Sequence, residues 1–220
     1  LVTGGAGYIG SHIILELLHY GYEVVVIDNL STGNKINIPK DVYFINGSIL
    51  DLSTLKKSMS QNIDGIIHLA ALKSASDSMK NPNLYSELNI NGSLMILNEM
   101  LNFNIKNIIF SSSAAIYGLP EYLPIDENHP KNPINFYGFT KLSIENYLKW
   151  YSKLKKINYA SLRYFNAAGY DSKSRIIGLE NNPANLLPII MNSLINNDFL
   201  KIYGNDYPTK DGTCIRDYIH

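Results

Sequence analysis

Apolar residues along the chain form short runs that alternate with longer segments of helical spacing. Positions 23–27 are β-branched and mostly apolar, which is typical of a strand buried on both faces. In 9–20 apolar residues recur every three or four positions, as on one face of a helix. The pattern predicts strands at 1–3, 23–27, 42–45, 65–69, 107–110 and 159–164, and helices at 9–20, 52–60, 82–104 and 135–155. This alternation predicts an α/β fold, a Rossmann-type doubly wound parallel sheet with helices on both faces.

The alternation stops after Phe165. Positions 166–183 are rich in Gly, Asn, Ser and Asp, which indicates a long irregular loop, and a helix at 184–197 and a short strand at 200–203 follow. We therefore expect a Rossmann domain at 1–165 and the start of a smaller, incomplete C-terminal substrate-binding domain at 166–220. The chain begins inside an apolar run and stops without a closing element, so we expect that both ends are cut.

Composition and charge exclude several classes of protein. Apolar residues make up 45% of the chain, enough for a packed core, and 19 basic residues balance 19 acidic ones. We therefore expect no nucleic-acid partner and no membrane association. A single cysteine, Cys214, excludes an internal disulfide, and the five histidines lack metal-ligand spacing, so we expect no metal. No apolar stretch is long enough to cross a bilayer and no signal peptide precedes the first motif, which predicts a cytoplasmic protein.

Glycine recurs at every third position, at Gly4, Gly7 and Gly10, between the first expected strand and helix. Glycine permits a tight turn and lets backbone N–H groups approach a pyrophosphate, which then lies at the positive end of the helix. Such a turn alone could be an ordinary loop, but Asp28 ends the next strand, 18 residues after Gly10. A carboxylate there can bind the ribose hydroxyls and repels a 2′-phosphate, so we predict NAD as the cofactor.

Tyr137 and Lys141 lie four positions apart in an expected helix and therefore share one face of it. A tyrosine needs its pKa lowered by about three units to act as a base near neutral pH, and a neighbouring ammonium group favours the phenolate. The pair could also be two unrelated surface residues, because the chain contains 16 tyrosines. Three serines at 111–113 close an expected buried strand, at the sheet edge where ligands bind. A serine there can relay a proton to Tyr137, although small polar residues often end strands for structural reasons.

These motifs resemble the extended short-chain dehydrogenase/reductase superfamily and, within it, the UDP-glucose 4-epimerase family. The resemblance runs along the whole chain and includes positions 4–12, 28–31, 68–73, 111–118, 163–166, 203–208 and 211–220. It implies that Ser113 is the serine that acts with Tyr137 and Lys141 in hydride transfer. Sugar-nucleotide 4,6-dehydratases carry an Asp-Glu pair directly after the strand-end serine or threonine, and here Ala114 and Ala115 cannot transfer protons. The resemblance therefore implies epimerisation at C4 of a UDP-hexose, the interconversion of UDP-glucose and UDP-galactose in galactose metabolism.

The resemblance also implies the role of each site residue. Tyr137 would take the proton of the sugar 4-hydroxyl, through or alongside Ser113, while hydride passes from C4 to a permanently bound NAD and then returns to the other face of a transient 4-keto sugar. Lys141 would hold the nicotinamide ribose and keep the pKa of Tyr137 low. The implied cofactor contacts are Gly4, Gly7, Tyr8, Ile9, Gly10, Asp28, Asn29, Leu30, Ser31, Thr32, Gly33, Ser48, Ile49, Leu69, Ala70, Ala71, Lys73, Ser113, Tyr137, Lys141 and Phe165. The implied UDP-sugar contacts are Lys73, Ser113, Tyr137, Asn166, Asn185, Leu186, Tyr203 and Arg216, the last suited to the pyrophosphate. Without the family, Phe165 and Tyr203 would be taken as core aromatics.

Two positions depart from the family pattern. Ser48 stands where the family usually has an aspartate that contacts the adenine, and Leu88 stands where it usually has an asparagine that touches the cofactor. Each change removes a cofactor hydrogen bond, so we expect weaker or altered NAD binding. Ser48 and Ile49 therefore rank below the other cofactor contacts.

Several alternatives stay open at the level of sequence. The protein could be an epimerase of UDP-arabinose or UDP-N-acetylglucosamine, or a decarboxylase of the same fold, and a non-catalytic NAD-binding relative is a further alternative. The family is longer than this chain, so we expect little epimerase activity from the 220 residues alone. Segments 82–104 and 135–155 are apolar over more than one face, and the matching helices in the family build a homodimer. A homodimer is therefore implied, although core packing explains part of the pattern.

Overall fold

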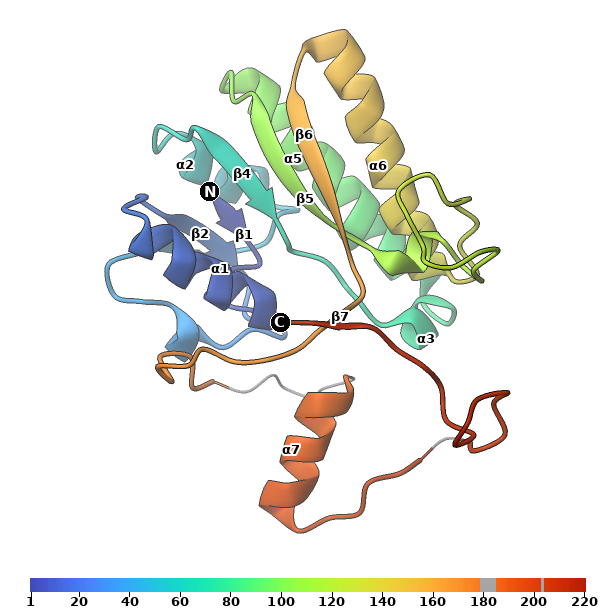
Figure 1. The fold of residues 1–220 in the computed structure, drawn as a ribbon. Coiled ribbons are helices and arrows are strands. Elements are labelled where there is room, and N and C mark those ends of the chain that lie inside the picture. Colours follow the sequence, from blue (N-terminus) through green and yellow to red (C-terminus); the bar gives the residue numbers. More distant parts are fainter. Residues whose placement is uncertain (179–184, 203) are drawn as a thin grey trace.

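In the computed structural model, which describes residues 1–178, 185–202 and 204–220, six parallel strands form one sheet (Figure 1). Their order is β3-β2-β1-β4-β5-β6. The chain starts at the centre, moves to one edge through β2 and β3, and then returns to build the other half from β4. The predicted doubly wound Rossmann-type sheet is confirmed. The strands are β1 (Val2–Thr3), β2 (Val25–Asp28), β3 (Tyr43–Asn46), β4 (Gly65–His68), β5 (Asn107–Ser113) and β6 (Asn158–Tyr164).

Helices cover both faces of the sheet. The helix α1 (Tyr8–His19) packs on one face, where Ile14 contacts a core of valines that includes Val2 and Val26. The helices α2 (Leu52–Met59), α5 (Gly92–Asn102) and α6 (Phe136–Lys155) pack on the other face. There Leu55, Met100 and Leu148, one from each helix, are fully buried in the larger core. The apolar periodicity of the sequence thus translates into two separate cores, one on each side of the sheet.

The expected helix 82–104 is divided into three parts. It consists of α4 (Pro82–Tyr85), a π-helical turn η2 (Ser86–Asn91) and α5. The wider turn contains the buried Asn89, whose side chain accepts a hydrogen bond from Leu72 N at 2.8 Å and donates to Leu72 O at 3.0 Å. Asn89 thereby fixes the loop that follows β4, and π-helical turns of this kind are frequent near functional sites. Three short helices that the sequence pattern did not predict are η1 (Lys35–Asn37), α3 (Ala75–Ser78) and η3 (Ala114–Ile116).

The residues after Phe165 lie on the side of the sheet where the strands end (Figure 1). The strands β7 (Asn166–Ala167) and β8 (Tyr218–Ile219) pair with each other in a separate two-stranded sheet. The expected helix 184–197 is present as α7 (Leu186–Asn196), whereas position 184 is outside the described residues. The expected strand 200–203 is wrong for 200–202, because this segment has no strand partner and Ile202 is 75% exposed. Position 203 is outside the described residues.

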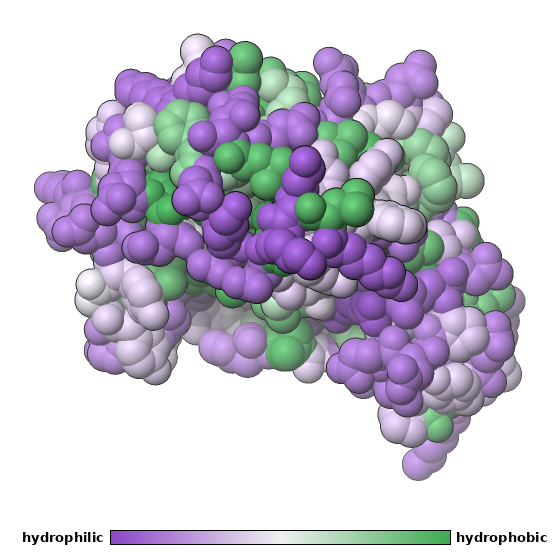
Figure 2. Space-filling model, turned by 90° about the horizontal axis from the view of Figure 1, so that it is seen from above, coloured by the Kyte–Doolittle hydropathy of each residue, from purple (hydrophilic) through white to green (hydrophobic). Residues whose placement is uncertain are grey.

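One face of the molecule illustrates how the surface is composed. Seen from above, hydrophilic residues cover most of this face and smaller apolar patches lie between them (Figure 2). Within the three described ranges, no helix is long and apolar enough to span a membrane.

Candidate active site

The glycine turn after β1 brings backbone segments into contact. At Gly4, which has a φ of +73°, an added Cβ would lie 2.7 Å from Ala70 N, and at Gly10 it would lie 2.3 Å from Gly4 O. Side chains at either position would therefore force the turn apart. The helix α1 begins directly after the turn, and its N-cap residue Gly7 provides no side-chain hydrogen bond to the first N–H groups. A tight turn that ends in an uncapped helix N-terminus fits the pyrophosphate of a dinucleotide.

Asp28 lies beside this turn, at the carboxyl end of β2. Its side chain is buried, Oδ2 accepts a hydrogen bond from Ala6 N at 2.9 Å, and Oδ1 accepts one from Leu30 N at 2.8 Å. These bonds fix the orientation of the carboxylate and leave each oxygen able to accept a second hydrogen bond. The loop after Asp28 returns to the turn, because Asn34 N donates to Ala6 O at 3.0 Å. The arrangement fits the ribose hydroxyls of an adenosine held next to the turn.

The structure brings Ser113, Tyr137 and Lys141 together at the carboxyl end of β5. Ser113 is the last residue of β5, and Tyr137 and Lys141 lie in the first two turns of α6. Lys141 Nζ donates to Ser111 O at 2.8 Å and lies 5.7 Å from the centroid of the Tyr137 ring. The start of α6 is fixed from α3, because Tyr137 N donates to Ser78 Oγ at 3.0 Å. The phenol, the ammonium group and the serine hydroxyl therefore share one small volume.

Burial controls the protonation of this cluster. Desolvation lowers the pKa of the fully buried Lys141 from 10.5 to about 7. Burial also raises the pKa of Tyr137, which a hydrogen bond with Ser113 offsets only in part. The expectation that Lys141 keeps the pKa of Tyr137 low is not met by the protein groups alone, because burial disfavours the charged form of both residues.

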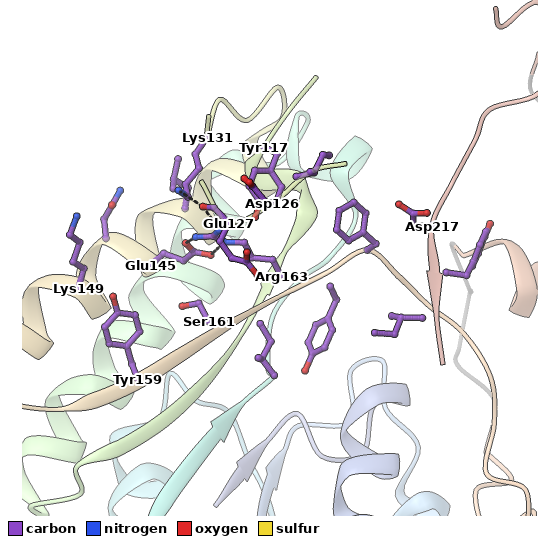
Figure 3. A pocket seen from close by; sticks show the side chains of 18 residues that line it. Tyr117, Asp126, Glu127, Lys131, Glu145, Lys149, Tyr159, Ser161, Arg163 and Asp217 are labelled. Atoms are coloured by element: carbon purple, nitrogen blue, oxygen red, sulfur yellow. Dashed lines mark hydrogen bonds and ion pairs between the residues drawn. The ribbon is translucent and has the colours of Figure 1, made fainter. Parts of the chain in front are cut away.

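A cavity of about 990 Å³ lies along the outer side of β6 and is not lined by the three clustered residues (Figure 3). Arg163 and Glu145 lie in it and form a two-point ion pair, with N–O distances of 2.8 and 3.0 Å. Glu145 also accepts from the buried Ser112 Oγ at 2.5 Å, and Arg163 donates to Tyr117 Oη at 2.8 Å. The glutamate hydrogen bonds raise the pKa of Arg163. Since these charges already pair with one another, we interpret the network as a clamp between β5, β6 and α6 that supports the adjacent cluster.

Comparison with known proteins identifies the family. The family model described as "NAD dependent epimerase/dehydratase family" matches residues 1–220. The chain belongs to this family. It is 45% identical to the UDP-glucose 4-epimerase of Halalkalibacterium halodurans, over 100% of this chain and 66% of that relative. It is 43% identical to the UDP-glucose 4-epimerase of Lactobacillus helveticus, over 100% of this chain and 67% of that relative. The crystal structure of UDP-glucose 4-epimerase from Brucella ovis in complex with NAD matches with a TM-score of 0.95 and 42% identity, over 100% of this chain and 68% of that chain. The chain thus spans about two thirds of the length of these relatives.

The remaining cofactor residues that the family resemblance implies fall into three groups. The residues just after β4 lie beside the start of the glycine turn, because Leu69 N donates to Thr3 O at 3.1 Å and Ala70 N donates to Thr3 Oγ1 at 3.3 Å. Lys73 is exposed, and Phe165, just after β6, is 40% exposed rather than a core aromatic. Ile49 is a core residue, and the Ser48 hydroxyl accepts a hydrogen bond from Leu50 N at 3.1 Å. The cofactor roles of all these residues, Ser48 and Ile49 included, remain predictions.

Of the implied UDP-sugar residues after Phe165, those that the structure describes lie in β7, at the start of α7 and just before β8. Asn166 Nδ2 donates to Asp217 O at 2.8 Å, which ties β7 to the residue before β8. Asn185, Leu186 and Arg216 are exposed. In the part of the chain that the structure describes, no hydrogen bond or ion pair joins these three residues to Ser113, Tyr137 or Lys141. Tyr203 lies outside the described residues. The substrate contacts therefore remain predictions.

One residue near the site that the sequence analysis did not single out for a role is His68. It is fully buried at the end of β4, with Nδ1 at 2.7 Å from Thr3 Oγ1 and Nε2 at 2.8 Å from Ser93 Oγ. Burial lowers the pKa of His68 to about 3, so the ring is neutral and joins β1, β4 and α5. The only sequence signal for it was a polar residue ending an apolar strand. Among the described residues there is no cluster of His, Cys, Asp and Glu that could hold a metal ion.

Proposed function

We propose that this protein is an NAD-dependent 4-epimerase of a UDP-hexose that interconverts UDP-glucose and UDP-galactose. The observation that carries the proposal is the cluster of Ser113, Tyr137 and Lys141 at the carboxyl end of β5, on the same sheet edge as the glycine turn and Asp28. The UDP-glucose 4-epimerases that align with the whole chain support it. NAD, when bound, accepts the hydride of the sugar C4 and returns it.

The proposed roles of the nucleotide-binding residues follow from their hydrogen-bonding capacity. The N–H groups at the start of α1 would bind a pyrophosphate, and Asp28 would accept hydrogen bonds from the ribose hydroxyls. Lys141, already anchored on Ser111 O, has further N–H donors for the second ribose. These residues hold and orient the cofactor, so that the sugar carbon meets it next to Tyr137.

Tyr137 is the proposed base for the sugar 4-hydroxyl, and Ser113 is the proposed relay. The Ser113 hydroxyl is close enough to the phenol to lower its pKa, so it is placed to pass a proton between the substrate and Tyr137. Because burial raises the pKa of Tyr137, the phenolate requires positive charge in the pocket. Protonated Lys141 and a cationic nicotinamide ring are the two groups of suitable charge.

The residues after Ser113 favour epimerisation over elimination. Ala114 and Ala115 form the start of η3, and Ala115 N donates to Ser113 Oγ at 3.2 Å. Removal of water from a sugar requires an additional acid and base, and alanine side chains supply neither. Oxidation at C4 followed by reduction on the opposite face requires only Tyr137, its relay and the cofactor.

The test is a coupled assay in which UDP-glucose formed from UDP-galactose is oxidised by UDP-glucose dehydrogenase. It is run on the chain and on the chain extended by the C-terminal third of the H. halodurans relative. Tyr137→Phe should lower turnover by about 10²- to 10⁴-fold, the usual effect of losing a general base. NAD should stay bound in that variant, since only the phenolic hydroxyl is removed and the ring remains. The choice of sugar is measured in parallel with UDP-N-acetylgalactosamine, by chromatographic separation of this substrate from the UDP-N-acetylglucosamine formed.

The matched control is Tyr22→Phe, which removes the hydroxyl of an exposed tyrosine between α1 and β2, outside both the cluster and α6. Its turnover should equal that of the unchanged protein. Turnover of Tyr137→Phe close to that of the control would overturn the assignment of Tyr137. Absence of both bound NAD and activity in the extended protein would overturn the proposed function.

We also propose that the protein acts as a homodimer in the cytoplasm, in galactose metabolism. Support comes from an exposed stripe on α6 in which Phe139, Tyr147, Trp150 and Leu154 recur at helical spacing and are 40–68% exposed. The single, exposed Cys214 agrees with a reducing compartment. Sedimentation should show a dimer that Trp150→Glu converts to a monomer, and an unchanged protein that sediments as a monomer contradicts the dimer.

A further inference from the structure

The segment 169–178, here called the strap, runs along the side of the sheet where the strands end. In Figure 1 it is the orange loop that passes beneath α1 and beside η1. It begins just after β7 and belongs to the irregular region that the sequence left without a function. Hydrogen bonds attach the strap to the first domain at two places that are far apart in the sequence.

The first attachment is to the glycine turn and the start of α1. Tyr8 Oη donates to Gly169 O, and Asp171 N donates to His12 Nε2 at 3.1 Å. Because a backbone N–H can only donate, Nε2 is the unprotonated nitrogen, and Nδ1–H donates to Tyr8 O at 2.8 Å. The Tyr170 ring lies against both rings, 5.7 Å from that of Tyr8 and 5.4 Å from that of His12. Polar and aromatic contacts therefore hold this end of the strap.

The second attachment is to η1, beyond the loop that follows Asp28. The side chain of the buried Asn37 donates to Gly178 O at 2.9 Å and accepts from Gly178 N at 2.6 Å. Both backbone groups of Gly178 are thus satisfied by one side chain. The approach is close, because a Cβ on Gly178 would lie 2.7 Å from Ile36 Cγ2 and 2.8 Å from Asn37 Oδ1. This end of the strap is therefore closely packed against η1 and hydrogen-bonded to it.

The two attachments are made to the two elements that we assign to the adenosine half of the cofactor. Tyr8 is the first residue of α1, directly after the turn that we assign to the pyrophosphate, and Asn37 follows the loop that we assign to the ribose. Asp28 connects these two elements through Ala6 N and Leu30 N. We propose that the strap closes over the adenosine half of the NAD site and slows release of the cofactor, with Asn37 and His12 as the residues that hold it closed. This inference rests on the proposed function, in which the same NAD must remain bound between oxidation and reduction of the sugar.

The test measures NAD release directly and does not depend on epimerase activity. Protein purified with its NAD is mixed with alcohol dehydrogenase and ethanol, which convert each released NAD to NADH. Asn37→Ala removes both hydrogen bonds to Gly178 and should release NAD about tenfold faster, since the net loss of one ordinary hydrogen bond already corresponds to roughly that factor. Gly178→Val should do the same by steric conflict with Ile36 and Asn37 Oδ1, while the Asn37 side chain keeps its hydrogen-bonding groups.

The matched control is Asn158→Ala. Asn158 also makes a side-chain hydrogen bond between two elements, to Asn107 Oδ1 at 3.0 Å, but at the amino end of the sheet. Its release rate should equal that of the unchanged protein. If Asn37→Ala and Gly178→Val both keep the rate of the unchanged protein, the strap does not retain NAD, although the proposed function stands. If neither the unchanged protein nor the C-terminally extended protein carries or binds NAD, the proposed function itself fails, and the strap proposal fails with it.

Discussion

Replacing Lys141 with methionine should stabilise the protein near neutral pH while lowering its turnover. The Lys141 side chain is 2% exposed and lies over the Phe110 ring, 4.9 Å from its centroid. Methionine has a similar length and no charge, so it can occupy the same apolar volume. The substitution therefore removes the cost of burying an ammonium group, together with the hydrogen bond from Nζ to Ser111 O.

The magnitude follows from the pKa of Lys141. Burial lowers it from 10.5 to about 7, so between these values the unfolded chain binds more protons than the folded chain and stability rises with pH. A shift of one pKa unit corresponds to about 1.4 kcal/mol, so the buried lysine costs about 4 kcal/mol at pH 7 and nothing above its unfolded pKa. Loss of the hydrogen bond to Ser111 O costs about 1–3 kcal/mol at either pH. The variant should thus be about 2 kcal/mol more stable at pH 7 and less stable than the unchanged protein at high pH.

Urea unfolding of nucleotide-free protein at about pH 7 and about pH 10 tests this reasoning. Lys149→Met is the matched control, because Lys149 is an exposed lysine on the same helix and its replacement should change stability by less than about 0.5 kcal/mol. The diagnostic quantity is the difference in stability between Lys141→Met and the unchanged protein. If this difference is the same at both pH values, burial of the Lys141 ammonium group does not destabilise the folded protein, and the reasoning is refuted.

Two further substitutions probe the turn and the clamp. Gly10→Ala places a Cβ 2.3 Å from Gly4 O and 2.7 Å from Gly5 Cα, so the turn must open. The purified variant should therefore contain no NAD, measured by absorbance. An NAD content equal to that of the unchanged protein would contradict the role assigned to the turn. Arg163→Met leaves the buried Glu145 carboxylate without its cation and should cost about 3–5 kcal/mol in urea unfolding. A loss below about 1 kcal/mol would show that the ion pair is not a structural clamp.

Local sequence pattern was sufficient for the sheet and most helices. β2 and α6 could be predicted because a run of buried β-branched residues and a long amphipathic segment are each encoded by neighbouring positions. The sequence predicted one continuous helix at 82–104 and missed the π-helical turn within it. This turn coincides with hydrogen bonds between Asn89 and Leu72, which are 17 positions apart. The strand expected at 200–202 failed for a related reason: apolar residues favour a strand only where a second strand is available to pair with it.

The candidate site divides in the same way. The spacing of Gly4, Gly7 and Gly10 and of Tyr137 and Lys141 is local, so the sequence could place each group in its element. The attachments of the strap join residues 159 and 141 positions apart, from His12 to Asp171 and from Asn37 to Gly178, and no local pattern encodes such contacts. Asn37 and His12 therefore gained a role only once the fold had brought these segments together.

The pKa values change the role assigned to Lys141. From spacing alone, an ammonium group next to Tyr137 was expected to favour the phenolate, which assumes that the lysine is fully charged. The structure buries both side chains, lowers the pKa of Lys141 to about 7 and raises that of Tyr137, so each group is closer to its neutral form than in water. A cationic ring placed beside both would favour the phenolate and disfavour the ammonium group. We therefore propose that Lys141 acts mainly as a donor that orients the site through Ser111 O, and that a cationic nicotinamide ring, when bound, would supply more of the charge that favours the Tyr137 phenolate.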